Sequence, residues 1–270
     1  MTLRVLSYLA PSVPASLFEA LATRMGAELG EDVALRFDES RSGPRPGEDE
    51  PFTSGRVDLA FLCATSYVWL SSGASPVVDL VGAAWVPADP RSHARPVYFA
   101  DVVGPASGAG ALEELVGGRV AYNDEVSLSG YHSLRFAFDT AGIQADRIEL
   151  VRSGSHLRSL ELLRSGDVDA AALDSTVWQR CRRHDPALAK EFRVISELGP
   201  HPVQPMVARA GLPQPVREAA RRTLVNAHAE SSVATALGNA ELVRFVAVDD
   251  RDYAGLRAQM ADLGWGGSGA

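Results

Sequence analysis

Short apolar runs alternate along the chain with segments whose apolar residues recur every three or four positions. The first run covers residues 3–9, the helical segment covers residues 15–29, and a second run covers residues 32–37. Spacing of three and four is typical of a helix that packs on a core, whereas short runs rich in Val, Leu and Phe predict strands. The pattern predicts a chain of alternating strands and helices.

Further strands are predicted later in the chain, and most of the segments between them have helical spacing. These strands cover residues 57–62, 95–104, 118–123, 148–151, 169–173, 192–198 and 204–210. Most of the runs are continuously apolar rather than alternating, which is typical of strands covered on both faces. We therefore predict an α/β fold with a mainly parallel sheet between helices.

Two long β-type segments, residues 96–104 and 192–209, bracket a middle block that has its own βαβα pattern. If the chain crosses into a second lobe at the first segment and returns at the second, two α/β lobes result, with a hinge and a ligand cleft between them. We predict that lobe I contains residues 1–95 and 205–270, and that lobe II contains residues 96–204.

Composition narrows the classes of partner. The chain has 270 residues, of which 46% are hydrophobic, which is enough for one large core or two modest ones. The net charge is −8 and the basic residues are scattered, so we expect no nucleic-acid partner. The longest apolar candidate, residues 76–87, is interrupted by Asp79 and is too short to span a membrane. We expect a monomer without membrane insertion.

The first residues lack a basic segment followed by an apolar stretch and a cleavage site, so no secretory leader is visible. A mature protein would look the same. The predicted location is therefore extracytoplasmic if a leader has been removed, and cytoplasmic otherwise.

Known cofactor and catalytic motifs are missing from the sequence. The six histidines include no pair at metal-ligand spacing, and the two cysteines form no CxxC motif. Gly108 and Gly110 lack the third glycine of a dinucleotide fingerprint, and residues 127–131 do not form a G-x-S-x-G nucleophile elbow. We predict no metal, no cofactor and no catalytic residue.

Residues 121–138 predict a strand end, a loop with small hydroxyl residues, and then a helix. A helix start leaves backbone N–H groups without partners and carries a partial positive charge, so it suits an oxyanion. Ser127 and Ser129 add hydroxyl donors, and Gly130 allows a close approach of the backbone. An ordinary N-cap formed by Ser129 explains the same residues equally well.

Two more polar helix starts follow predicted strands, at Gly154-Ser155-His156 and at Asp174-Ser175-Thr176. Helix starts that follow parallel strands meet at one edge of the sheet, where open α/β sheets bind ligands. Together they favour a binding site. His156 could instead bond to a carbonyl group, and Asp174 could simply cap its helix.

Four segments, in this order, resemble the phosphate/phosphite/phosphonate substrate-binding proteins of ABC transporters. They are GRVDLAFLCATSYVWL, RPVYFADVVG, RVAYNDEVSLSGYHSLRFAF and SGSHLRSLELLRSGDVDAAALDS, and the resemblance runs from about residue 3 to at least residue 180. It implies a type II periplasmic-binding-protein fold that closes on a phosphorus oxyanion. It also implies a protein without enzymatic activity that serves an ABC permease in uptake or reports to a sensor partner.

The resemblance also implies ligand-binding residues. The family's Ser-Thr-Ser-Gly-Tyr loop corresponds to Ser127, Leu128, Ser129, Gly130 and Tyr131. Leu128 replaces the threonine, so that only its backbone N–H group remains as a donor. The other implied contacts are His156, Asp174, and Tyr67 after the third predicted strand; Tyr8, at the end of the first strand, is our addition. Tyr67 could instead be a core aromatic residue.

A second function uses the same scaffold. Some cytoplasmic enzymes of the menaquinone and thiamin pathways have a similar fold and length and lack an export signal, and fold does not determine function. Against this alternative, the sequence offers no acid and base pair beyond Asp174 and His156.

Overall fold

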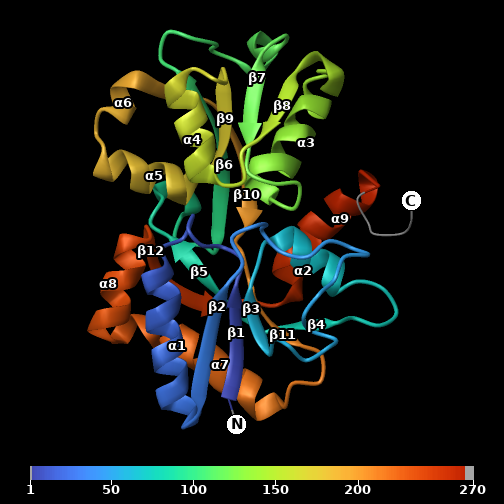
Figure 1. Cartoon of the computed structure of the whole chain (residues 1–270), viewed down its shortest axis with the longest axis vertical. Coiled ribbons are helices and arrows are strands. Elements are labelled where there is room, and N and C mark those ends of the chain that lie inside the picture. Colours follow the sequence, from blue (N-terminus) through green and yellow to red (C-terminus); the bar gives the residue numbers. More distant parts are fainter. Residues whose placement is uncertain (1, 265–270) are drawn as a thin grey trace. The chain divides into compact units, whose positions relative to one another are not determined.

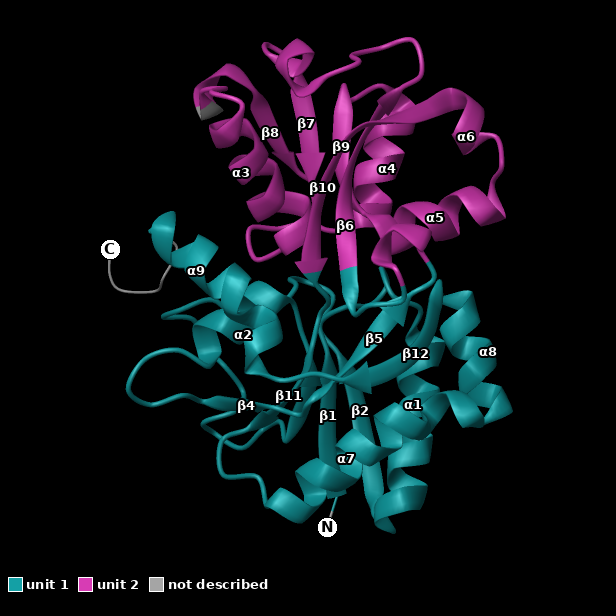
Figure 2. Cartoon of the chain, turned by 180° about the vertical axis from the view of Figure 1, so that it is seen from behind, with its two compact units in different colours: residues 1–88, 94–97, 202–270 teal, residues 89–93, 98–201 magenta. Residues whose placement is uncertain are grey.

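The computed structural model describes residues 2–264 and divides the chain into two compact units (Figure 2). Unit 1 contains residues 1–88, 94–97 and 202–270, and unit 2 contains residues 89–93 and 98–201. Residues 265–270 of predicted lobe I lie outside the described residues. The interpretation of the two units as lobes that close on a ligand, with the predicted boundaries, stays a prediction.

Unit 1 is built on a five-stranded sheet with the strand order β2-β1-β3-β11-β4 (Figure 1). Its strands are β1 (Thr2–Ser7), β2 (Asp32–Phe37), β3 (Leu59–Phe61), β4 (Val78–Leu80) and β11 (Met206–Arg209). A separate two-stranded sheet pairs β5 (Ala83–Pro87) with β12 (Leu242–Ala247). The helices of unit 1 are α1 (Ala15–Leu29), α2 (Ala64–Leu70), α7 (Gln214–Asn226), η5 (Ala227–Ala229), α8 (Ser231–Asn239), η6 (Asp250–Tyr253) and α9 (Ala254–Asp262).

Helix α1 shows how the apolar pattern becomes structure. Leu17, Leu21 and Met25 are buried on one face, and the helix contacts α7 and α8. It ends at Leu29 because Gly30 adopts a left-handed conformation with φ of 63°, where glycine carries no steric penalty. The observed bounds are those that the spacing predicted.

Unit 2 is built on a second five-stranded sheet, with the strand order β10-β6-β9-β7-β8. Its strands are β6 (Val97–Pro105), β7 (Arg119–Tyr122), β8 (Glu149–Arg152), β9 (Ala170–Asp174) and β10 (Phe192–Pro202); the first residue of β6 and the last of β10 belong to unit 1. The helices are η1 (Pro90–Ser92), η2 (Leu112–Leu115), η3 (Leu128–His132), α3 (Ser133–Thr140), η4 (Ala145–Arg147), α4 (His156–Ser165), α5 (Ser175–His184) and α6 (Leu188–Glu191).

Neighbouring residues in the strands of unit 2 face opposite sides of the sheet, and both sides are covered. Val103 and Leu173 pack in one buried cluster with residues of α4 and α5. Val102 and Ala172 pack in the other buried cluster, which contains Leu134 of α3. Two-sided burial explains why these strands read as continuous apolar runs.

Strand direction differs in part from the prediction of a mainly parallel sheet. Strands β1, β2 and β3 run parallel, as do β7, β8 and β9. However, β11 runs antiparallel to β3 and β4, and β6 runs antiparallel to β9. An apolar run reads the same for either direction, so the sequence pattern could not distinguish them. Strands β4, β5 and β12 were not predicted.

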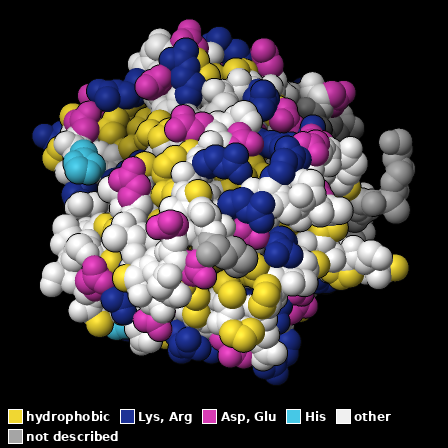
Figure 3. Space-filling view, turned by 60° about the horizontal axis from the view of Figure 1, so that its bottom comes forward, with side chains coloured by type: hydrophobic (Ala, Val, Ile, Leu, Met, Phe, Trp, Pro, Cys, Tyr) yellow, Lys and Arg dark blue, Asp and Glu magenta, His cyan; other side chains and the backbone are white. Residues whose placement is uncertain are grey.

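On the face shown in Figure 3, basic and acidic side chains are intermixed. Among residues 2–264, no helix combines the length and the apolar character that crossing a membrane requires.

Candidate functional site

Three helix starts lie at one edge of the sheet of unit 2. Strands β7, β8 and β9 are parallel neighbours, with β7 in the middle. They lead into η3, α4 and α5, respectively. The carboxyl ends of parallel strands share one edge, so the helices begin next to one another there. The three polar segments singled out in the sequence occupy these three positions.

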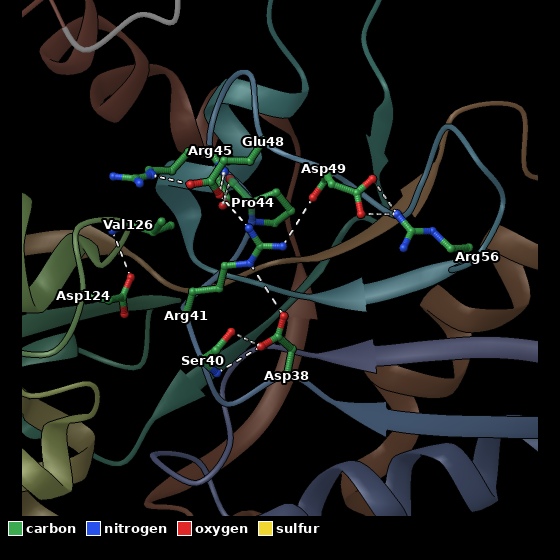
Figure 4. A network of polar contacts seen from close by, with 11 residues as sticks. Asp38, Ser40, Arg41, Pro44, Arg45, Glu48, Asp49, Arg56, Asp124 and Val126 are labelled. Carbon is green, nitrogen blue, oxygen red and sulfur yellow. Dashed lines mark hydrogen bonds and ion pairs between the residues drawn. The ribbon is translucent and has the colours of Figure 1, made fainter.

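The first helix start is the π-helix η3, which continues without a break into α3. The turn before it is held by Asp124, whose Oδ1 accepts a hydrogen bond of 2.9 Å from the backbone N–H of Val126 (Figure 4). Ser127 is the N-cap, because its Oγ accepts a hydrogen bond of 3.0 Å from the N–H of Gly130. The alternative in which Ser129 caps the helix is therefore wrong. As an acceptor, Ser127 keeps its hydroxyl proton for another partner.

Gly130 is required by packing. A Cβ atom there would lie 1.8 Å from Oδ1 of Asn123 and 3.2 Å from its backbone nitrogen. Gly130 thus packs closely against the residue that follows β7, and the predicted close approach of its backbone to an oxyanion stays a prediction. The side chain of Leu128 is buried, and the ring of Tyr131 lies 4.9 Å from that of Tyr122.

The second helix start brings His156 to the first. The Nε2 atom of His156 lies 3.2 Å from Oγ of Ser129, and the two residues are 5% and 2% exposed. The Nδ1 atom lies 3.3 Å from the carbonyl oxygen of Ala172 in β9. The predicted alternative, a histidine bonded to a carbonyl group, is therefore observed together with the contact to the serine loop.

Burial lowers the pKa of His156, although the carboxylates of Asp174 and Asp124 act in the opposite direction. The imidazole is therefore neutral near pH 7. A carbonyl oxygen only accepts, so Nδ1 carries the proton and donates it to Ala172. Nε2 is then an acceptor, and the Ser129 hydroxyl donates to it.

The third helix start is capped by Asp174. Its Oδ1 accepts hydrogen bonds from the backbone N–H and the hydroxyl of Thr176, at 2.8 and 2.6 Å. The capping role proposed as an alternative is thus confirmed. A contact between Asp174 and a ligand stays a prediction.

The two tyrosines predicted to line the site belong to unit 1. The hydroxyl of Tyr67 donates a hydrogen bond of 2.6 Å to Oδ1 of Asp250, and its ring packs edge-to-face on Tyr253 at 5.0 Å. Tyr67 is 2% exposed, so it has the surroundings of a core aromatic residue. Tyr8 lines a pocket of about 440 Å³ together with Arg36 and Arg41, and burial raises its pKa to about 12.

The guanidinium group of Arg41 lies 6.0 Å from the centre of the Tyr8 ring. Charged side chains of the loop between β2 and β3, Arg41 among them, pair with one another (Figure 4). Arg41 lies 2.6 Å from Glu48, which also pairs with Arg45 at 2.9 Å. Arg56 pairs with Asp49 at 2.6 Å. Each of the three guanidinium groups of the loop therefore pairs with a carboxylate, and Arg41 and Arg45 share that of Glu48.

One contact next to the candidate site was missed by the sequence reasoning. The Oγ atom of Ser133 donates a hydrogen bond of 2.7 Å to the carbonyl of Leu128 and lies 2.8 Å from Nε2 of His201. Both side chains are buried, and the rings of Tyr98 and His201 lie edge-to-face with their centroids 6.0 Å apart. The pair is separated by 68 residues, so no local pattern could have revealed it. Among residues 2–264, no group of His, Cys, Asp or Glu side chains is arranged to hold a metal ion.

Comparison with solved structures defines the class of protein. The chain is similar to PhnD1 from Prochlorococcus marinus in complex with methylphosphonate, with a TM-score of 0.80, 17% identity, and coverage of 97% of this chain and 98% of that chain. It is also similar to a binding protein component of an ABC phosphonate transporter from Pseudomonas aeruginosa, with a TM-score of 0.76, 17% identity, and coverage of 97% and 88%.

A third similar structure is the periplasmic aliphatic sulphonate binding protein SsuA from Escherichia coli, with a TM-score of 0.63, 16% identity, and coverage of 98% and 91%. These likenesses establish the type II periplasmic-binding-protein fold, which confirms the predicted fold class.

A sequence model of one family, described as "ABC transporter, phosphonate, periplasmic substrate-binding protein", matches residues 3–253. The chain belongs to this family. The resemblance seen in the sequence is confirmed, and the protein is a substrate-binding protein of the phosphonate ABC transporter type rather than an enzyme. The family is periplasmic, binds a small phosphonate ligand and works with an ABC permease.

Proposed function

We propose that this protein captures a small phosphorus oxyanion, namely a phosphonate, phosphite or phosphate, at the three helix starts of unit 2. The observation that carries the proposal is the arrangement of residues 127–131: a capped helix start with two buried serines, one of which contacts His156. The hydroxyl of Ser127 and the backbone N–H groups of the helix start would act as donors, and the helix dipole favours the negative charge.

The proposed site uses uncharged donors. A buried anion that accepts hydrogen bonds from neutral groups is stabilised by charge-assisted bonds, which are about twice as strong as neutral ones. Leu128 supplies no hydroxyl, so the site has fewer side-chain donors than a loop with threonine there. Methylphosphonate, which the similar Prochlorococcus protein binds, is a suitable small candidate.

The remaining residues of the proposed site have other roles. Of these residues, Asp174 is proposed to meet an amino group of the ligand, and Gly130 to allow a close approach of the backbone to the oxyanion. Tyr131, Tyr67 and Tyr8 are retained as proposed ligand contacts. We further propose that the protein acts as an extracytoplasmic monomer that serves its permease. A protein that reports to a sensor partner would use the same binding site and differ only in the protein with which it interacts.

The test is thermal unfolding against phosphate, phosphite, methylphosphonate, 2-aminoethylphosphonate and sulfate. A ligand at about 100 times its Kd stabilises by roughly 2.7 kcal/mol, which corresponds to about 5 to 10 °C for a chain of this size. Ser127→Ala should weaken the binding of the best ligand by about 1 to 3 kcal/mol, because one charge-assisted bond is lost.

Ser165→Ala is the matched control, because Ser165 is an exposed serine of the same unit, at the end of α4. Equal affinities of the two variants for every oxyanion would contradict the assignment of residues 127–131 to the site.

A further inference from the structure

The hydroxyl of Ser129 has one proton, and the neighbouring groups determine which atom receives it. The N–H at Nδ1 of His156 faces the carbonyl of Ala172, which can only accept. Nε2 therefore needs a donor, and the hydroxyl of Ser129, 3.2 Å away, is that donor. Towards any ligand at this position, Ser129 then presents lone pairs rather than a proton.

A second proton on the imidazole would make Nε2 a donor and so reverse the hydrogen bond between Ser129 and His156. The imidazole does not readily take that proton. Two carboxylates face His156, Asp174 from the start of α5 and Asp124 from the turn after β7, and both favour the charged imidazole. Burial outweighs them and lowers the pKa of His156. A rotated ring would place carbon atoms against Ala172 and Ser129, leaving both without their partner.

We propose that the site binds its oxyanion together with one proton, so that a P–OH group of the ligand donates to Oγ of Ser129 while Ser129 donates to His156. This inference rests on the proposed function. It identifies the substrate class as singly protonated phosphorus oxyanions. Sulfate and sulfonates have no such proton near neutral pH and would direct an unprotonated oxygen at the lone pairs of Ser129.

A proton held in the complex makes the affinity depend on pH. Above the second pKa of the ligand, the protonated species becomes scarce, and the affinity falls by about tenfold per pH unit. Below that pKa, the affinity is constant. The pH at which the affinity begins to fall is therefore set by the ligand. For phosphite and for methylphosphonate, it should equal the second pKa of each. The pKa of His201 is about 4, so this second buried histidine stays neutral over the tested range.

The experiment is isothermal titration calorimetry of the wild-type protein with phosphite and with methylphosphonate, between about pH 6 and about pH 9. Measurements at each pH use buffers of different ionisation enthalpy, which gives the number of protons taken up. We expect the pH slope above each ligand's second pKa, uptake approaching one proton there, and no binding of sulfate at the same concentrations.

Two variants test the mechanism. Ser129→Ala removes the acceptor and should lose the pH slope. In His156→Gln the side-chain amide can donate to Ser129, which frees the serine proton for a fully deprotonated ligand, so the slope should flatten. His184→Gln, at an exposed position at the end of α5, should keep the slope of the wild type.

The outcomes separate the two proposals. Wild-type protein that binds a phosphorus oxyanion with constant affinity and no proton uptake across this range would overturn the inference and leave the proposed function intact. Wild-type protein that binds none of these oxyanions at any pH would overturn the proposed function and the inference with it. The wild-type titrations decide between these outcomes even if a variant fails to fold.

Discussion

In the Ser129–His156 pair, the serine donates a hydrogen bond to the imidazole. Ser133 lies four residues further along the same helix, and in the Ser133–His201 pair the imidazole donates to the serine. The direction of each hydrogen bond follows from a carbonyl group that bonds to one member of the pair. The carbonyl of Ala172 takes the Nδ1 proton of His156, which leaves Nε2 as an acceptor. The carbonyl of Leu128 takes the hydroxyl proton of Ser133, which leaves the serine oxygen as an acceptor.

The difference shows that the same two residue types can serve different purposes in one unit. Ser129 of the first pair lies in the loop that we propose contacts the ligand, and His156 lies at the start of α4. The second pair fixes the carbonyl of Leu128 and so holds the π-helix in place from β10. The neighbouring carbonyl groups set the direction of the serine–histidine hydrogen bond in each pair.

Gly130→Ala is the change expected to have the largest effect, because it would displace the helix that carries both serines. The added Cβ would overlap Asn123, so we expect a loss of about 3 kcal/mol in the free energy of unfolding. Urea unfolding measures this loss.

Gly255→Ala is the control for that variant, because a Cβ atom added at Gly255 in α9 would meet no other group within 4 Å. We expect it to be neutral or stabilising by up to about 1 kcal/mol. Equal stability of the two variants would contradict the tight packing of η3 on β7.

The second largest effect is expected in the pH dependence of stability, to which His201 contributes. Burial lowers the pKa of His201 from 6.5 to about 4. Between these values the unfolded chain binds a proton that the folded chain does not, so this contribution to stability is complete above pH 6.5 and is lost as the pH falls towards 4. From about pH 7.5 to about pH 5, we expect His201 to account for roughly 2 kcal/mol of the lost stability.

Urea unfolding at both pH values should show this loss in the wild type and in His184→Gln, but a loss smaller by that amount in His201→Gln. Identical pH dependence in wild type and His201→Gln would contradict the assignment of His201 as a neutral buried donor.

Ser133→Ala should have the smallest effect on stability. It also tests whether the two serine–histidine pairs have different functions. It leaves the Nε2 proton of His201 without its acceptor, so we expect a loss of about 1 to 2 kcal/mol in the free energy of unfolding. The affinity for a phosphorus oxyanion should change less than in Ser129→Ala, because Ser133 directs its proton to Leu128. Calorimetric titration of both variants measures the difference, and a greater loss of affinity in Ser133→Ala would reverse the roles of the two pairs.

Local signals explain which parts of the fold and site could be predicted. The bounds of α1 and β2 follow from apolar spacing within each segment, and they match the predicted ranges 15–29 and 32–37. The helix start at residues 127–131 and the position of His156 were found for the same reason, because helix-start chemistry is a property of a few adjacent residues. The directions of β6 and β11 were not found, because pairing partners lie far away in the sequence.

By itself, then, the sequence determined the α/β class, most of the strands, the three polar helix starts and the family. Tertiary structure alone decided that Ser127 rather than Ser129 caps the helix, that Ser133 pairs with His201, and which atom of each serine–histidine pair donates. The physical reason is that a hydrogen bond has a direction. Here that direction depends on carbonyl groups such as that of Ala172, which only the folded sheet brings into contact with the imidazole.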